Sequence, residues 1–150
     1  MFEWFRRRKK PYNENQILND GLDYAMEFGS NWLQPIQTRL VELYPELSET
    51  ELDNYNSKCK AAMTTGHDQV YALAEESGKN ASFDIFASNY IKSYPWINDK
   101  NLKHIFSQGM YYAWKDIGWE FTPNKLINKD KKQLAVFVPQ HFSQQFFAHY

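Results

Sequence analysis

Cysteine is nearly absent from this 150-residue chain, because Cys59 is the only one. A single thiol cannot form an intrachain disulfide, so the sequence excludes a disulfide-stapled scaffold. Low cysteine content is typical of reducing compartments, and we therefore expect a cytoplasmic protein. The chain also has no apolar run of roughly 18 residues, the length that a membrane-spanning helix requires. Its charged N-terminus is not followed by an apolar stretch, so it lacks the pattern of a secretory signal.

Turn-forming residues are scarce as well, with six glycines and six prolines. The long segments between them favour helices over a sheet of many strands. Aromatic residues make up 17% of the chain and hydrophobic residues 43%, which is typical of a globular protein with a bulky core. At this length we expect one domain, 1–150, made of an N-terminal segment (1–11), a helical core (12–118) and a C-terminal extension (119–150).

The first apolar stripe predicts a helix from Asn13 to about Tyr44. Asn13 and Gln16 have the spacing of a capping box. Apolar and small residues then recur in steps of three and four: Leu18, Leu22, Ala25, Gly29, Trp32, Ile36, Leu40 and Leu43. Pro35 interrupts this segment and removes a backbone donor, so we expect a kink or a break near Trp32.

Three further helices follow from their start and stop signals. Ser48 and Glu51 form a second capping box, and that helix continues to Gly78. Ser82 starts a shorter helix that ends before Pro95, and Asn98 or Asp99 starts one that ends at Gly118. The predicted fold is an all-α bundle of four main helices, two long antiparallel and two shorter, with a packed C-terminal extension. We find no internal repeat at the periods of solenoid proteins.

The C-terminal extension gives a weaker pattern. Residues 134–138 form either a short strand or an extended segment laid on the bundle, and residues 141–150 have the spacing of a last short helix.

Sequence motifs for catalysis or cofactor binding are absent. There is no Gly-x-Ser-x-Gly elbow, no glycine-rich phosphate loop and no Glu-x-x-His pair of the kind that binds metal in helical bundles. We therefore predict no cofactor and no metal site. Cys59 lies on the apolar stripe of the second helix, which favours a buried thiol over a reactive one.

His67 and Asp68 are the only suggestive catalytic pair. Adjacent His and Asp on a helix resemble the dyad of the HD-type metal-dependent phosphohydrolases, which are also all-helical. Those enzymes need a further histidine upstream, and none precedes His67 here. We therefore favour a His67 that borders the buried stripe, with Asp68 facing water. A small hydrolase that uses His67, Asp68 and a distant histidine is kept as an alternative.

The N-terminal segment combines aromatic with basic side chains. The candidate interaction residues there are Phe2, Trp4, Phe5, Arg6, Arg7 and Arg8. They have three interpretations: packing onto the bundle, contact with a partner protein, or weak contact with an anionic membrane surface. Binding of nucleic acid is disfavoured because residues 11–84 carry thirteen acidic and only four basic side chains.

A second aromatic cluster lies at the end of the fourth helix and includes Tyr111, Trp114 and Trp119. These side chains either cover the C-terminal extension or form an exposed patch for a partner, where Trp and Tyr are common hot-spot residues.

Taken together, the sequence predicts a non-enzymatic protein-interaction module: an adaptor, inhibitor or small regulatory subunit in a bacterial-type cytoplasm. No small-molecule substrate is evident. Residues 85–150 carry eight basic and four acidic side chains, so the acidic front of one copy is complementary to the basic back of another. Homodimerisation is therefore a specific variant of this hypothesis.

Overall fold

The computed structural model describes residues 12–32 and 34–118, and all its regular structure is helical. The elements in chain order are α1 (Glu14–Ala25), α2 (Gln37–Leu43), α3 (Glu49–Ser77), the 3₁₀ turn η1 (Gly78–Asn80), α4 (Phe83–Ser93) and α5 (Asp99–Ile117). The described ranges contain no strand, so the predicted all-α class is confirmed. The predictions for residues 1–11 and 119–150 lie outside the described residues.

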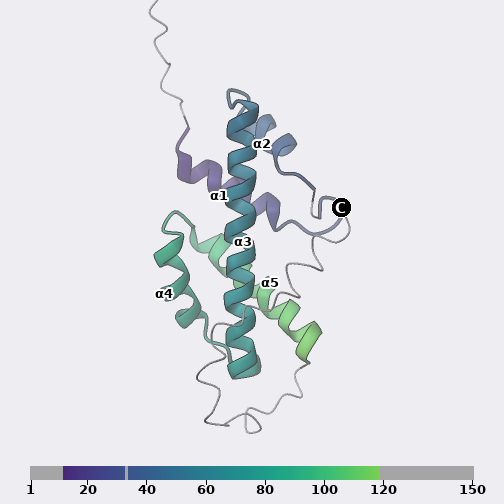
Figure 1. Ribbon diagram of the computed structural model, residues 1–150, viewed down its shortest axis with the longest axis vertical. Coiled ribbons are helices and arrows are strands. Elements are labelled where there is room, and N and C mark those ends of the chain that lie inside the picture. Colours follow the sequence, from purple (N-terminus) through teal and green to yellow (C-terminus); the bar gives the residue numbers. More distant parts are fainter. Residues whose placement is uncertain (1–11, 33, 119–150) are drawn as a thin grey trace, which may run out of the picture.

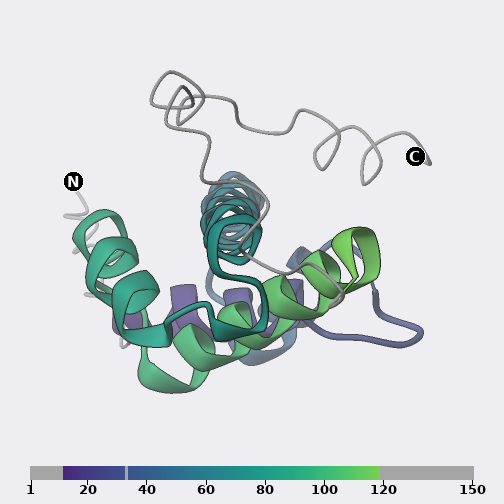
Figure 2. The same cartoon turned by 90° about the horizontal axis from the view of Figure 1, so that it is seen from below.

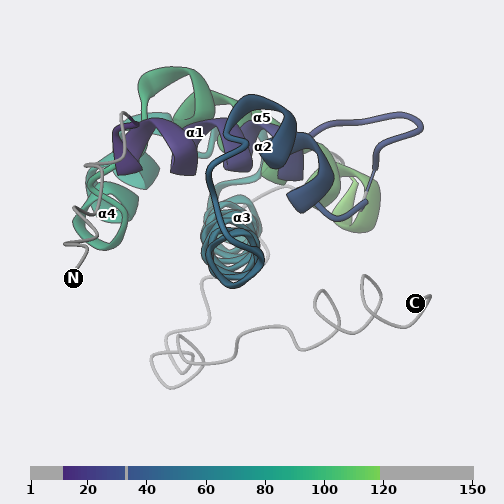
Figure 3. The same cartoon turned by 90° about the horizontal axis from the view of Figure 1, so that it is seen from above.

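Helix α3 is the axis of the fold, and the other helices pack around one side of it (Figure 1). Seen along α3, helices α1, α2 and α5 lie on the same side, and α4 flanks α5 (Figures 2 and 3). Helices α1 and α5 both cross α3 obliquely and lie next to each other. This arrangement buries one continuous apolar cluster between α3 and its neighbours.

The helix starts agree closely with the sequence. Ser48 and Glu51 form the predicted capping box, in which each side chain bonds the backbone N–H of the other residue. Ser82 and Asn98 accept from the backbone N–H three residues onward. Asn13 also caps α1, but its side chain accepts from the N–H of Asn15.

The predicted first helix is divided into α1 and α2, with residues 26–36 between them. The break is wider than expected and begins at Met26, six residues before Trp32. Two local features explain it: Gly29 has a φ of +92°, a conformation that ends helical geometry, and Pro35 cannot donate a helical hydrogen bond. Because of this break, only the short α2 turns back along α3, and α1 crosses α3 instead.

The two helical hairpins α2–α3 and α4–α5 repeat the same local structure with an offset of 50 residues. Tyr44-Pro45 and Tyr94-Pro95 occupy the two connections, and the tyrosines have φ/ψ of −129°/68° and −129°/65°. In each turn a backbone N–H three residues onward donates to the tyrosine carbonyl, from Leu47 at 3.1 Å and from Ile97 at 3.2 Å. The chain therefore contains an internal structural repeat with a period of 50 residues, which was not predicted from the sequence.

The repeat extends to the helix on which each hairpin packs. The hydroxyl of Tyr44 donates to Asp20 on α1, and the hydroxyl of Tyr94 donates to Thr65 on α3 at 3.1 Å. The next residue is a glycine in both helices, Gly21 and Gly66. A Cβ on Gly21 would meet Ile36 and Leu40 of the first hairpin, and a Cβ on Gly66 would meet Tyr90 and Ile105 of the second. Helix α3 thus supports the second hairpin in the way that α1 supports the first.

None of the helices that the structure describes is both long and apolar enough to cross a membrane.

Candidate interaction surface

Tyr111 and Trp114 lie exposed at the C-terminal end of α5, with 43% and 45% of their surface accessible. Their position follows from helical geometry, because Gly109 and Ala113 of α5 face the core and leave the flanking positions outside. The two rings lie 6.0 Å apart between centroids. The other predicted interaction residues, in the N-terminal segment and at Trp119, lie outside the described residues.

The segment between α1 and α2 brings two more aromatic rings to this place. Phe28 is 53% exposed and stacks on Trp32 with ring centroids 4.9 Å apart. Trp32 in turn lies 6.2 Å from Tyr112, whose ring contacts Tyr111 at 5.6 Å. These contacts join the loop and α5 in one aromatic surface, defined as Phe28, Trp32, Tyr111, Tyr112 and Trp114.

Phe28 and Trp32 were not predicted as site residues. The apolar stripe predicted Trp32 on the core face of a long helix, but the chain leaves helical geometry after Ala25 and the Trp32 ring lies against Tyr112 of α5. Phe28 was not on that stripe. The only sequence signal for this outcome is the combination of Gly29 and Pro35, which marks an irregular segment without saying where its side chains go.

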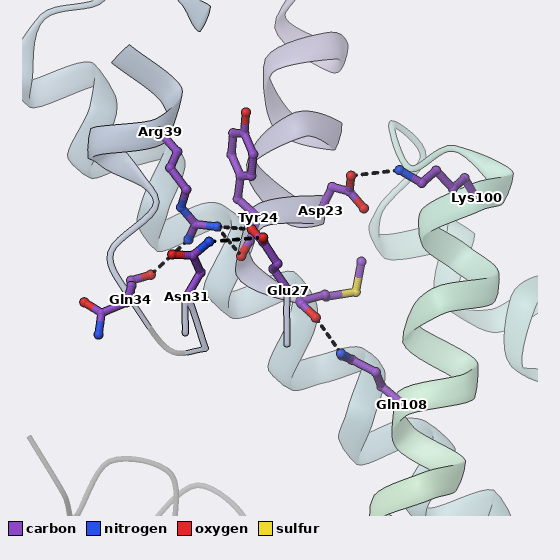
Figure 4. A network of polar contacts seen from close by, with 9 residues as sticks. Asp23, Tyr24, Glu27, Asn31, Gln34, Arg39, Lys100 and Gln108 are labelled. Atoms are coloured by element: carbon purple, nitrogen blue, oxygen red, sulfur yellow. Dashed lines mark hydrogen bonds and ion pairs between the residues drawn. The ribbon is translucent and has the colours of Figure 1, made fainter. Parts of the chain in front are cut away.

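A polar network centred on Arg39 holds the loop against α1 and α2 (Figure 4). The guanidinium Nη1 donates to Glu27 and to the backbone oxygen of Tyr24 (3.2 Å), and Nη2 donates to the backbone oxygen of Gln34 (3.4 Å). Asn31 donates to the same Glu27 carboxylate at 3.1 Å. The planar, five-donor guanidinium suits this role, because one side chain fixes both ends of the loop.

A hollow of about 450 Å³ opens between the loop and α5. It is lined by Phe28, His104, Ser107, Gln108 and Tyr111. Two exposed rings of the aromatic surface, Phe28 and Tyr111, belong to this lining, together with the buried Gln108. A hollow of this size can receive one or two apolar side chains of a partner.

His67 lies beneath this surface and is only 3% exposed. Gln108 donates its amide nitrogen to the backbone oxygen of Met26 at 2.6 Å, which leaves its amide oxygen to accept from Nε2 of His67 at 3.1 Å. This arrangement requires a hydrogen on Nε2 of the imidazole. Burial lowers the pKa of His67 to about 4, against the opposing effect of the Gln108 hydrogen bond. His67 therefore ties α3 to α5 and, through Gln108, to the end of α1.

Asp68 follows His67 in sequence but is half-buried on a neighbouring face of α3, where burial raises its carboxyl pKa. Within the described part of the chain, no group of three or more His, Cys, Asp or Glu side chains is arranged to hold a metal ion. Cys59 is fully buried, as predicted, and its thiol donates to the backbone oxygen of Leu18 at 3.4 Å. Burial raises the pKa of this thiol to about 12, which keeps it protonated and unreactive at neutral pH.

Comparison with protein-family models, with curated proteins and with solved structures gives no match for this chain.

Proposed function

We propose that this chain is a non-enzymatic protein-interaction module whose contact site is the aromatic surface. The observation that carries the proposal is the exposure of Phe28, Tyr111 and Trp114 side by side, from two elements that are distant in sequence. Exposed aromatic rings that form a continuous patch mark contact sites in soluble proteins, because water solvates them poorly. Trp and Tyr also contribute most to binding at such sites.

The rigidity of the surface supports this function. The loop that carries Phe28 and Trp32 is held by Arg39, and α5 is held by Gln108 and His67. A partner therefore meets rings that are already positioned, so little conformational entropy is lost on binding. An adaptor, an inhibitor or a small regulatory subunit needs a surface of this kind.

The hydrolase alternative gains no observation in its favour. A general base must reach substrate, whereas His67 is buried and its Nε2 atom is directed to Gln108. The residues that line the hollow include His104 but no carboxylate. We also propose a cytoplasmic setting, because the chain has a single cysteine and that thiol is buried.

The test compares a patch variant with a matched surface variant. Tyr111→Ser with Trp114→Ser removes two exposed rings, and Ile85→Ser with Ile91→Ser removes two α4 side chains that are 53% and 42% exposed. Both proteins are assayed for self-association by sedimentation and for capture of host proteins by quantitative affinity purification.

We expect the patch variant to lose the association that the wild-type protein and the α4 variant keep. If all three proteins bind alike, or if the wild-type protein neither captures a partner nor self-associates, the proposal is wrong.

A further inference from the structure

The exposed face of α5 extends beyond the aromatic rings toward the start of the helix. Residues at steps of three and four along the helix remain outside the core: Lys100, Lys103, His104, Ser107, Tyr111 and Trp114. The first half of this face carries Lys103 and Lys100, of which Lys100 is paired with Asp23 at 2.8 Å, and the second half is aromatic. Lys115, which lies 5.6 Å from the Tyr111 ring centroid, adds a cation at the aromatic end, although Asp116 follows it. We call this set the α5 face.

A surface of opposite character lies at the end of α2. Val41 and Leu43 are 37% and 49% exposed, and the exposed carboxylates Glu42 and Glu46 lie next to them in sequence. Arg39 of the same helix does not cancel this charge at the surface, because its guanidinium is half-buried and paired with Glu27. We call Val41, Glu42, Leu43 and Glu46 the α2 tip.

The two surfaces cannot meet within one molecule. Helix α2 lies beside the first turns of α3, where Gln37 donates to Asp53 at 3.1 Å. The aromatic end of α5 lies beside the second half of α3, where Gly109 faces Val70. The 17 residues of α3 between Asp53 and Val70 span roughly 25 Å at the α-helical rise.

We propose that the α5 face binds the α2 tip of a second copy of this chain. Val41 and Leu43 lie on opposite sides of α2, so one of them enters the hollow beside Phe28 and Tyr111, and Glu42 and Glu46 meet Lys103 and Lys115. Contact of two α5 faces is disfavoured because it would bring like charges together. This inference rests on the proposed function and names the partner.

Such a contact joins two different surfaces, so it is heterologous. A pair of bound copies still has one unoccupied α5 face and one unoccupied α2 tip. Association then continues until a ring closes or an open chain forms. The ionic part of the contact makes association weaker at high salt. The near-neutral total charge of −1 leaves little net repulsion between copies.

The test uses two full-length variants that each lack one surface. Variant A carries Tyr111→Ser and Trp114→Ser on the α5 face, and variant B carries Val41→Ser and Leu43→Ser on the α2 tip. All four positions are exposed or nearly so, which keeps the cost to folding small, and circular dichroism with urea unfolding checks this. Sedimentation velocity at 0.05 M and 1 M salt then gives the size of each protein alone and of an equimolar mixture.

We expect wild-type protein to form oligomers that dissociate at 1 M salt, and A or B alone to associate at least tenfold more weakly. The equimolar mixture of A and B should form a 1:1 dimer and nothing larger, because only one intact pair of surfaces remains. A charge pair gives an independent check: Lys103→Glu and Glu42→Lys should each weaken association alone and restore it when mixed.

Other results overturn the inference in distinguishable ways. If B associates like wild-type protein and A does not, the α5 face pairs with itself or with another surface. If wild-type protein is a monomer but captures a host protein through Tyr111 and Trp114, the proposed function stands and the second copy is not the partner. If it is a monomer and captures nothing, both proposals fail.

Discussion

The Nε2 atom of His67 lies 3.1 Å from the amide oxygen of Gln108, which links the centre of α3 to α5 beneath the aromatic surface. The imidazole is neutral there at pH 7, because burial disfavours the charged ring. Its pKa falls to about 4 in the folded chain, from 6.5 in an exposed reference state.

This shift predicts acid sensitivity. Above pH 6.5 His67 is neutral in both states and the fold has its full stability. As the pH falls from 6.5 to 4, the unfolded chain takes up a proton that the folded chain does not, so stability decreases. We expect a loss of about 2 kcal/mol between pH 7.5 and pH 5, measured by urea unfolding at each pH. His67→Gln, which can still donate to Gln108, should remove most of this dependence. An unchanged slope in that variant would contradict the assignment.

Asn19 predicts a second, pH-independent effect. Its buried side-chain amide donates to the backbone oxygens of Asn15 and Trp96, both at 2.8 Å, and its oxygen accepts from the N–H of Asn98 at 2.9 Å. Asn19→Leu leaves the part-buried backbone groups of Trp96 and Asn98 in the α4–α5 turn without this partner, at a cost of about 1–3 kcal/mol in unfolding free energy. Asn15→Ala, at an exposed position on the same helix, should change stability by less than about 0.5 kcal/mol. Equal effects of the two substitutions would contradict this role.

We expect Gly66→Ala to destabilise the fold, although alanine normally favours a helix more than glycine does. Alanine in place of glycine stabilises an exposed helix by about 1 kcal/mol. At Gly66 a Cβ would overlap the Cγ2 methyl of Ile105 and lie 3.2 Å from the Tyr90 ring. We expect Gly66→Ala to cost about 1–3 kcal/mol in urea unfolding, because a branched buried methyl group cannot move aside.

Ile105→Leu removes the branch at Cβ, so the double variant Gly66→Ala/Ile105→Leu should recover part of that loss. If the changes in unfolding free energy of the two single variants simply add in the double variant, Gly66 and Ile105 are not in contact as described.

We expect Arg39→Lys to loosen only the loop that carries Phe28 and Trp32. Lysine keeps the charge but cannot reach Glu27, Tyr24 and Gln34 together. For Arg39→Lys we expect about tenfold faster amide hydrogen exchange at Trp32 and Gln34, whose N–H groups donate within this loop. Lys100→Ala removes the exposed ion pair with Asp23 instead, and exchange in the loop should then stay at the wild-type rate. A uniform rise across α1 and α3 in Arg39→Lys would indicate global destabilisation and not a loop clamp.

The starts of α1, α3, α4 and α5 were predictable because capping is local, whereas α2, whose N-cap Ile36 makes no side-chain hydrogen bond, was not predicted as a separate helix. Ser48 finds Glu51 and Asn98 finds Asn101 within one turn, so the interacting groups are close in sequence and their geometry depends little on the rest of the fold. The position of Tyr111 and Trp114 beside the core stripe is also a local consequence, because helical periodicity sets them next to the buried Ala113.

The polar core was not predictable in this way. Asn19, Asn101 and Gln108 lie on helices where asparagine and glutamine usually face water, and their partners are 77 to 82 residues away. Such residues are buried only when a distant backbone group satisfies them, and a single sequence does not show which group that is. The repeated hairpin was not predicted because few residues are identical at equivalent positions of the two hairpins. Only the backbone angles of the two Tyr-Pro turns, which the structure gives, are nearly the same.

Local signals in the sequence predict that this protein is helical, where α1, α3, α4 and α5 begin, and that Tyr111 and Trp114 flank the core stripe of α5. The path of the loop between α1 and α2 and the exposure of these rings depend on contacts that are distant in sequence. The break after Ala25 removes helical hydrogen bonds, but Gln108 donates to the backbone oxygen of Met26, and Arg39 donates to the backbone oxygen of Gln34. These long-range contacts place Trp32, which stacks on Phe28, against Tyr112 and so complete the aromatic surface.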